Sequence, residues 1–302
     1  MSKCKGCGKE LQNINKEEAG YTPKLDNKLC ERCFKIKNYN YHDENATVMS
    51  NEDIIDKINS KEACTFFLCD FLNLNEDSIN LYNKIKYPKV LIITKIDILP
   101  NNIDLEVLRS NIKRVYKIKE VFFVSSTSNM IENKLFDYIA TYEKILVAGP
   151  TSCGKSTFIN KMFKKDLTVS NYKNTTLEFI TLKEDNLTII DAPGFNNSSY
   201  NSLKLKGNIK PRTMILKKGY ELLVGDYILY ADKEESITIY TPKNILATSR
   251  KIRKEYDNKY NIASKTDLIL GSLGFIYFKD KCNINININD NLNIRESLVA
   301  KK

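Results

Sequence analysis

The sequence lacks a run of 18 consecutive apolar residues, the length that a membrane-spanning helix needs. Its N-terminus also lacks the apolar stretch of a signal peptide, so we expect a cytoplasmic protein without membrane contact. Histidine is nearly absent, and the single His42 has no neighbours that would make it a catalytic base. Eight cysteines in a reducing cytosol indicate metal binding and buried thiols rather than disulfides.

Acidic residues are fewer than basic ones, and the formal net charge of the 302-residue chain is +10. Such a charge favours an extended anionic partner such as nucleic acid, because binding releases counterions. The alternative is compositional drift, since Lys, Asn and Ile are frequent throughout the chain.

The composition and the spacing of apolar residues change along the chain, which predicts three regions. Residues 1–45 are polar and cysteine-bearing, which predicts a small module that a bound metal ion holds together. Residues 46–204 alternate short apolar strands with segments of helical length, which predicts an α/β domain with a mainly parallel sheet. Residues 205–302 change to a period of two, as in Asn283–Asn289, which predicts a β-rich domain. The expected strands of the middle region are 64–69, 89–94, 120–124, 144–148 and 187–190.

Residues 149–156 match the phosphate-binding pattern GxxxxGK[ST], between an expected strand and an expected helix at 157–164. Backbone N–H groups of such a loop wrap the phosphates, Lys155 reaches the β- and γ-phosphates, and the Ser156 hydroxyl ligates Mg²⁺. The predicted nucleotide contacts in this loop are Gly149, Ser152, Cys153, Gly154, Lys155, Ser156 and Thr157.

The strand at 187–190 ends in Asp191-Ala-Pro-Gly194, a DxxG element. It is expected to place the Asp191 carboxylate beside the metal and the Gly194 N–H near the γ-phosphate. Between the two motifs, Thr176 is our candidate for the threonine that closes on Mg²⁺, with Thr175 as the alternative.

Guanine is distinguished from adenine by a carboxylate that accepts from its ring N–H and exocyclic amine, typically within the pattern [NT]KxD. Thr94, Lys95 and Asp97 match this pattern after an apolar strand, but they precede the phosphate loop. Ser125 and Ser126 then supply a second base-contacting loop. A second match at Ser264–Asp267 follows polar residues that do not form a buried strand, so we interpret it as a turn.

The order base motif, second base loop, phosphate loop, switch threonine, DxxG is a circular permutation. Such a chain still builds one site, because all of these loops lie at the carboxyl ends of sheet strands. In this order of motifs the chain resembles, over nearly its whole length, the YqeH-type circularly permuted GTPases of bacterial small-subunit ribosome assembly. The resemblance implies GTP/GDP and Mg²⁺ as cofactors.

The head carries two CxxC pairs, Cys4/Cys7 and Cys30/Cys33, which supply four thiolates for a structural Zn²⁺. The segments at 20–23 and 30–39 also look like the head of that family. Aromatic residues interleave with basic ones here, as an RNA-facing surface needs, although such aromatics also pack the minimal core of zinc modules. These residues are Tyr21, Phe34, Tyr39, Tyr41, Lys28, Arg32, Lys35 and Lys37.

Three positions depart from common GTPase patterns. Phe195 stands where Ras-type enzymes have the water-positioning glutamine, which suggests slow hydrolysis assisted by another group or a partner. Ser152 replaces an asparagine that helps many such GTPases hold potassium. Thr94 replaces the commoner asparagine of the base motif.

We therefore expect a GTP-hydrolysing switch that binds ribosomal RNA or a small-subunit precursor. The alternatives are an ATP-using P-loop enzyme, in which Thr94–Asp97 is accidental, and a nonenzymatic RNA-binding scaffold with structural nucleotide. The candidate phosphate contacts in the tail are Arg212, Lys217, Lys218, Arg250, Lys251, Arg253 and Lys254.

Overall fold

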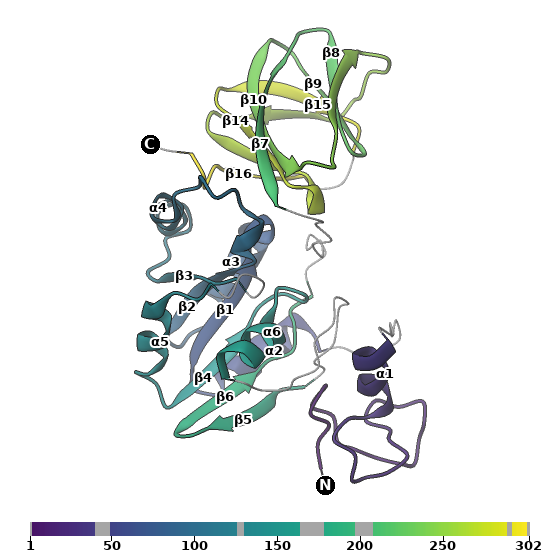
Figure 1. Ribbon diagram of the computed structural model, residues 1–302, viewed down its shortest axis with the longest axis vertical. Coiled ribbons are helices and arrows are strands. Elements are labelled where there is room, and N and C mark those ends of the chain that lie inside the picture. The colour runs from purple at the N-terminus through teal and green to yellow at the C-terminus, as the bar shows by residue number, and fades with distance from the viewer. Residues whose placement is uncertain are drawn as a thin grey trace. The chain divides into compact units, whose positions relative to one another are not determined.

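The computed structural model describes residues 2–39, 49–125, 130–163, 178–196, 208–288 and 292–300 (Figure 1). The chain divides into two compact units. The first comprises Met1–Ile96 and Glu120–Ser202, and the second comprises Asp97–Lys119 and Leu203–Lys302.

A six-stranded sheet organises the first unit, in the order β3-β2-β1-β4-β6-β5. All neighbouring strands are parallel except β5, which pairs antiparallel with β6. The predicted α/β class and all five predicted strands are confirmed, and β5 is an additional edge strand. The strands are β1 (Cys64–Asp70), β2 (Lys89–Thr94), β3 (Val121–Phe123), β4 (Lys144–Ala148), β5 (Ile180–Glu184) and β6 (Leu187–Asp191).

Helices connect these strands. Helix α2 begins after Ser50, whose side chain accepts a hydrogen bond from the Asp53 N–H, and it buries Ile54, Ile55 and Ile58. Among the described residues, none of the helices has the length and apolar character needed to span a bilayer. The helices of the first unit are α1 (Glu31–Tyr39), α2 (Asn51–Asn59), α3 (Glu76–Asn83), α5 (Asn133–Ile139) and α6 (Lys155–Phe163), with a 3₁₀ helix η1 (Phe71–Asn73).

The core on one side of this sheet is built from alternate residues of its central strands. Phe66 and Leu68 of β1 pack with Ile145 and Val147 of β4 and with Phe158 of α6. All five are essentially inaccessible to solvent. Each such side chain contributes about 1.5–3 kcal/mol on burial, so this core fixes the strand ends from which the loops of the site emerge.

The second unit contains two antiparallel five-stranded sheets, in the orders β16-β13-β14-β10-β7 and β11-β8-β9-β15-β12. One hydrophobic core combines residues from both sheets, as in a β-sandwich. The predicted alternation in the tail is confirmed in β15 (Cys282–Ile286), where Cys282, Ile284 and Ile286 are buried. The other strands are β7 (Ile209–Leu216), β8 (Tyr220–Val224), β9 (Tyr227–Ala231), β10 (Glu235–Pro242), β11 (Ala247–Lys251), β12 (Lys259–Ile262), β13 (Thr266–Ile269), β14 (Phe275–Phe278) and β16 (Asn293–Glu296).

Helix α4 (Leu105–Tyr116) belongs to this second unit, together with the 3₁₀ helices η2 (Ile96–Ile98), at the boundary, and η3 (Gly271–Leu273). The Asn111 amide donates hydrogen bonds of 3.0 Å to the carbonyls of Leu298 and Ala300. Arg114 forms an ion pair of 2.6 Å with Glu296 of β16. The C-terminal residues therefore hold a helix that lies far earlier in the chain.

Candidate functional site

Strand β4 runs directly into the phosphate loop, which ends where α6 begins at Lys155. Gly149 has φ +146, and a Cβ there would lie 2.1 Å from the Leu68 carbonyl oxygen. Gly154 has φ +101 and Ser152 has φ +62, so the loop has left-handed backbone at these two residues as well as at Gly149. This backbone is the kind of nest that presents successive N–H groups to an anion at a helix N-terminus.

The DxxG segment lies against this loop. The Thr151 N–H donates to the Phe195 carbonyl at 3.0 Å, and the Phe195 N–H donates to the Gly149 carbonyl at 3.2 Å. A Cβ at Gly194 would lie 3.1 Å from the Lys155 ammonium nitrogen. The structure therefore places the Gly194 backbone beside Lys155, the residue that we predict to contact phosphate.

Lys155 is 7% exposed, and its ammonium donates to the carbonyls of Gly149 and Pro150 at 3.1 Å each. Asp191 is fully buried at the end of β6, in register with Val147 of β4. Ser156 and Thr157 are half-buried in the first turn of α6. A buried lysine, a buried carboxylate and a hydroxyl at the same sheet edge match the donor set that holds Mg²⁺ and phosphate. The predicted switch residue Thr176 and its alternative Thr175 lie outside the described residues.

The base motif contacts the phosphate loop directly. The Thr94 hydroxyl donates to the Cys153 carbonyl at 2.7 Å, and the Lys95 ammonium donates to the Ser152 carbonyl at 2.9 Å. Two segments separated by more than 50 residues are thus joined by two hydrogen bonds.

The second base loop follows β3. The Ile96 N–H donates to the Val124 carbonyl at 3.4 Å, and Ser125 is almost fully buried after it. Ser126 lies outside the described residues. Asp97 is half-buried in η2, immediately after Ile96.

Asp70 is a residue of this region that the sequence patterns did not indicate. It lies at the end of β1, is fully buried and forms an ion pair of 3.3 Å with Lys95. Its carboxylate also accepts from the backbone and side-chain nitrogens of Asn73. Asp70 therefore fixes the ammonium that bridges the base motif and the phosphate loop. The only sequence signal for it is an acidic residue at the end of an apolar strand.

Phe195, which occupies the position of the Ras-type glutamine, is fully buried. Its ring stacks on Phe67 of β1, with centroids 5.9 Å apart. This side chain anchors the DxxG segment in the core and offers no polar group to a water molecule.

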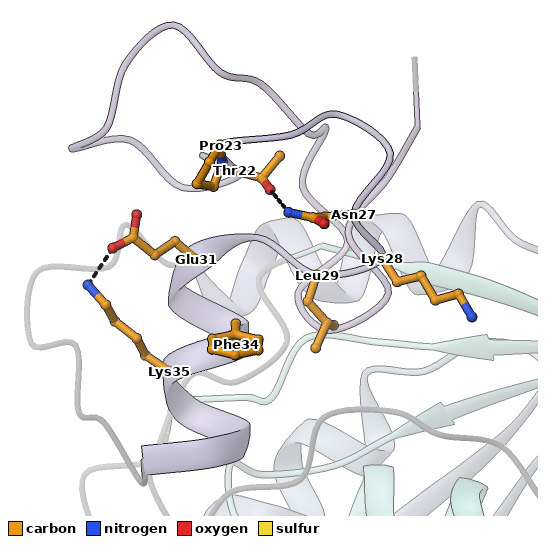
Figure 2. Close-up of a pocket in the computed structure, with 8 residues that line it drawn as sticks. All are labelled: Thr22, Pro23, Asn27, Lys28, Leu29, Glu31, Phe34 and Lys35. Atoms are coloured by element: carbon orange, nitrogen blue, oxygen red, sulfur yellow. Dashed lines mark hydrogen bonds and ion pairs between the residues drawn. The ribbon is translucent and has the colours of Figure 1, made fainter.

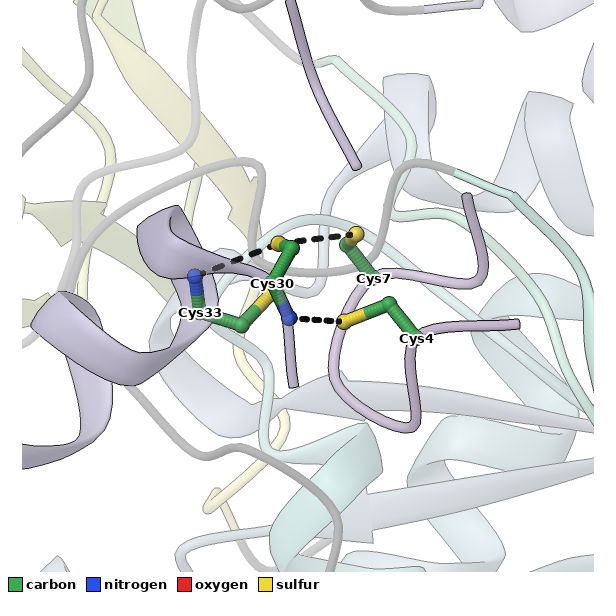
Figure 3. Close-up of side chains that lie close together, drawn as sticks. All are labelled: Cys4, Cys7, Cys30 and Cys33. Atoms are coloured by element: carbon green, nitrogen blue, oxygen red, sulfur yellow. Dashed lines mark hydrogen bonds between the residues drawn. The ribbon is translucent and has the colours of Figure 1, made fainter. Parts of the chain in front are cut away.

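The four head cysteines converge, as Figure 3 shows. Their sulfurs all lie within 4.8 Å of one another, and each residue is at most 1% exposed. The Cys7 and Cys30 sulfurs are 3.9 Å apart, against roughly 3.8 Å for a tetrahedral site with Zn–S bonds of about 2.3 Å. The N–H groups of Gly6 and Cys30 point at the Cys4 sulfur, at 3.4 and 3.2 Å, as donors do to metal thiolates.

The four thiols shift one another's pKa values. Hydrogen bonds from Cys33 lower the pKa of Cys30 to about 7, and a bond from Cys30 lowers the pKa of Cys4 well below its ordinary value. The same contacts with Cys30 raise the pKa of Cys7 and of Cys33. Four converging sulfurs in a buried space fit a divalent, thiophilic cation such as Zn²⁺.

The cysteine module contacts Glu178, which lies shortly before β5. The Glu178 N–H donates to the Cys7 carbonyl at 3.0 Å, and the Glu178 carboxylate pairs with Lys9 at 2.8 Å. The remaining cysteines (Cys64, Cys69, Cys153 and Cys282) are buried and lie outside this cluster.

The second [NT]KxD-like match does not supply a nucleotide carboxylate. Asp267 lies in β13, is fully buried and faces Arg295 at 3.8 Å. The polar residues before it form β12, which is mostly exposed, so they do not make a buried strand, as predicted. The turn that we assigned to Ser264–Asp267 is wrong for its second half, because Thr266 and Asp267 pair within a sheet as part of β13.

Two tail arginines that we listed as phosphate contacts are held within the second unit. Arg250 pairs with the buried Glu221, and Arg212 donates to Thr241 and to the Ile245 carbonyl.

Two family models match this chain. The model described as RsgA GTPase matches residues 72–201, and the model described as 50S ribosome-binding GTPase matches residues 144–261. Both matched segments include the phosphate loop and the DxxG element.

Among relatives, the chain is 29% identical to the uncharacterized protein YqeH of Bacillus subtilis, over 82% of this chain and 78% of that protein. It is 32% identical to the small ribosomal subunit biogenesis GTPase RsgA of Mesomycoplasma hyopneumoniae, over 43% of this chain and 46% of that protein. A solved structure, GNP-bound YlqF from T. maritima, aligns with a TM-score of 0.34 and 17% identity, over 49% of this chain and 57% of that chain.

Proposed function

Since this chain is a circularly permuted GTPase of the YqeH type, we propose that it is a GTP-dependent switch in assembly of the small ribosomal subunit. The observation that carries the nucleotide part is the pair of hydrogen bonds from Thr94 and Lys95 to the phosphate-loop carbonyls. The RsgA relative, whose name states small-subunit biogenesis, supports the ribosomal part. We place this activity in the cytoplasm.

Each residue has a defined task in this proposal. Ser156, Asp191 and Thr176 hold Mg²⁺, which neutralises charge on the β- and γ-phosphates when bound. Lys155 and the Gly194 N–H contact the γ-phosphate. Asp97 accepts from guanine, while the Asp70–Lys95 pair keeps the base motif against the phosphate loop. Since Phe195 is buried and apolar, another group or a partner must orient the attacking water. Cys4, Cys7, Cys30 and Cys33 hold Zn²⁺ as a structural ion.

Base selectivity separates this function from an ATP-using enzyme. We expect Asp97→Asn to shift preference from guanosine to xanthosine nucleotides, because the amide donates where the carboxylate accepts. Competition binding with GTP, XTP and ATP measures it. Unchanged tight GTP binding by Asp97→Asn would refute the base assignment.

The switching claim concerns RNA affinity. The net charge of +10 predicts salt-dependent binding of small-subunit ribosomal RNA, and loss of the γ-phosphate should change that affinity. A filter-binding assay with GDP and with a non-hydrolysable GTP analogue compares the two states at fixed salt. Equal affinities in the two states would refute the switching claim.

Multiple-turnover phosphate release that Lys155→Ala abolishes would exclude a nonenzymatic scaffold.

A further inference from the structure

A pocket of about 610 Å³ lies on the cysteine module, between the loop that precedes Cys30 and the first turns of α1 (Figure 2). Glu31 and Lys35 form an ion pair of 2.6 Å there, and every lining residue falls within positions 22–35. The pocket therefore belongs to the cysteine module and not to the nucleotide-binding loops. A pair of hydrogen bonds at the start of α2, in contrast, acts directly on the DxxG segment.

Asn51, the first residue of α2, holds the backbone of Asn196, which follows the DxxG element and Phe195. Its amide nitrogen donates to the Asn196 carbonyl at 2.6 Å, and its amide oxygen accepts from the Asn196 N–H at 2.8 Å. One planar amide thus satisfies both main-chain groups of a residue 145 positions away. Donor meets acceptor on both sides, as in the pairing of two neighbouring strands.

The helix that carries Asn51 is itself fixed in the first unit. It starts at the Ser50 cap and buries three isoleucines on one face. The first residue of a packed helix moves only with that helix. Asn51 therefore offers Asn196 a fixed point of attachment.

The DxxG segment is also held by two other parts of the first unit. The Ala192 N–H donates to a β4 carbonyl at 3.0 Å, and Phe195 forms a bridge with the phosphate loop. Asn51 adds a hold at Asn196, so the Phe195 bridge lies between two fixed points. Gly194 lies inside this held stretch, and its backbone cannot shift far without breaking one of these contacts.

We propose that Asn51 is a positioning residue for the γ-phosphate: it fixes the DxxG segment so that the Gly194 N–H is in place before GTP binds. The proposal rests on the function above, in which Gly194 contacts the γ-phosphate. GDP lacks that phosphate, so preorganisation of this contact concerns the triphosphate alone. Asn51 therefore contributes to the preference for GTP over GDP, and it acts through Asn196 rather than by contact with the nucleotide.

Asn59, the last residue of the same helix, provides a matched control. Its amide nitrogen donates to the Lys84 carbonyl at 3.2 Å, and its amide oxygen accepts from the Lys86 N–H at 2.8 Å. Both asparagines are half-buried and hold backbone from an end of α2, but Asn59 holds the connection between α3 and β2. Asn59→Ala thus removes a similar pair of hydrogen bonds and leaves the DxxG segment intact.

The test measures affinities for GDP and for a non-hydrolysable GTP analogue with Mg²⁺, by competition with a fluorescent guanine nucleotide. It uses the whole 302-residue chain loaded with zinc. We expect Asn51→Ala to weaken analogue binding about three- to tenfold and to leave GDP affinity unchanged, because two hydrogen bonds are lost. Asn59→Ala should bind both nucleotides as the wild type does.

Asn51→Asp separates the hydrogen bonds from the stability of the helix. An acidic first residue suits the start of a helix, so this variant should unfold in denaturant at least as late as the wild type. Its carboxylate accepts from the Asn196 N–H but cannot donate to the Asn196 carbonyl, so analogue affinity should still fall. A fall without any loss of stability is a result that a merely structural role of Asn51 would not give.

Amide hydrogen exchange reports the contact itself. In Asn51→Ala the Asn196 N–H loses its acceptor, whereas in Asn59→Ala the Lys86 N–H does, so each variant should speed exchange at its own site. In Asn51→Asp the Asn196 N–H keeps an acceptor and should stay protected.

The outcomes separate the role of Asn51 from the proposed function. If the wild type binds neither guanine nucleotide, the proposed function fails together with this role. If the wild type binds the analogue and Asn51→Ala binds it equally well, only the role of Asn51 is wrong. An equal loss of GDP and analogue affinity would overturn the proposal as well, and so would tighter analogue binding by Asn51→Ala, because the contact would then oppose the γ-phosphate.

Discussion

Gly149 has a backbone conformation that leaves no room for a side chain. A Cβ at this position would meet the Leu68 carbonyl oxygen at 2.1 Å and the Cys153 sulfur at 3.0 Å. Both neighbours are buried, Leu68 in β1 and Cys153 within the phosphate loop, so neither moves easily. Because Gly149 also accepts from Lys155 and Phe195, any displacement reaches the phosphate lysine and the DxxG segment.

We therefore expect Gly149→Ala to weaken GTP affinity roughly tenfold or more, since the left-handed backbone alone costs about 1–2 kcal/mol and the clash adds to it. Gly219→Ala is the matched control, because Gly219 has φ +80 but nothing lies within 4 Å of its added Cβ. That variant should lose about 1 kcal/mol of stability and keep its GTP affinity. Calorimetric titration with GTP and chemical denaturation measure both quantities. Equal GTP affinity of the two variants would contradict the steric argument.

Local spacing made several residues predictable from sequence. The phosphate loop and the paired CxxC motifs each occupy a few adjacent positions, so their chemistry is visible in a short window. Asp70 was not predictable in this way, because its role depends on β1 lying beside β2 in the sheet. Strand order is a property of the fold, and only the fold places this carboxylate against Lys95.

At the scale of elements, the pattern of apolar residues predicted the buried strands. It missed the strands whose sequences lack such a pattern. Strands β2 and β4 have the bounds that their apolar runs predicted, 89–94 and 144–148. Strand β5 buries mainly Ile180, and its remaining residues are partly or fully exposed at the sheet edge. An edge strand with polar side chains on its open face carries little sequence signal. In contrast, β15 was predictable because Cys282, Ile284 and Ile286 alternate strictly with Asn.

The cysteine module differs from the other elements in what holds it together. Its core cluster consists of the four cysteines and Leu11, with Leu29 packed against them. Such a small core cannot offset the loss of chain entropy without a metal, whereas Cys64, Cys153 and Cys282 belong to large cores.

We expect zinc removal to expose four thiols and leave four protected. Burial raises the pKa of Cys153 and raises that of Cys282 to about 12, so both remain unreactive thiols at pH 8. The measurement is alkylation at pH 8 with and without a strong chelator, followed by peptide mass spectrometry. Labelling should appear at Cys4, Cys7, Cys30 and Cys33 after chelation. A sample that contains excess Zn²⁺ is the control. Labelling of Cys153 under these conditions would show instead that the whole first unit depends on the metal.

At the scale of the molecule, both nucleotide-sensing segments lead into the second unit. The chain passes from the base motif at Thr94–Asp97 into Asp97–Lys119, which belongs to that unit. It also passes from the DxxG element towards β7. The second unit is thus joined to both segments through separate stretches of backbone, which, under the proposed function, gives nucleotide state a route to the tail.

The contact that ties α4 to the C-terminal residues joins positions 187 apart, and no sequence pattern indicates it. Asn111 is 3% exposed and satisfies two carbonyls at once. In Asn111→Ala these carbonyls lose their donor, which costs about 1–3 kcal/mol where the groups stay buried. Ser110→Ala is the matched control, since Ser110 is the preceding, exposed residue of the same helix.

We expect Asn111→Ala to speed amide hydrogen exchange in α4 and β16 together, by roughly 5- to 150-fold if the full cost falls on this contact. Exchange in β4 and α6 should be unchanged, because they belong to the other unit. Ser110→Ala should resemble the wild type. If α4 alone exchanged faster while β16 stayed protected, the C-terminal strand would not depend on the helix. A change in the base motif would then reach α4 but would not pass from it to β16.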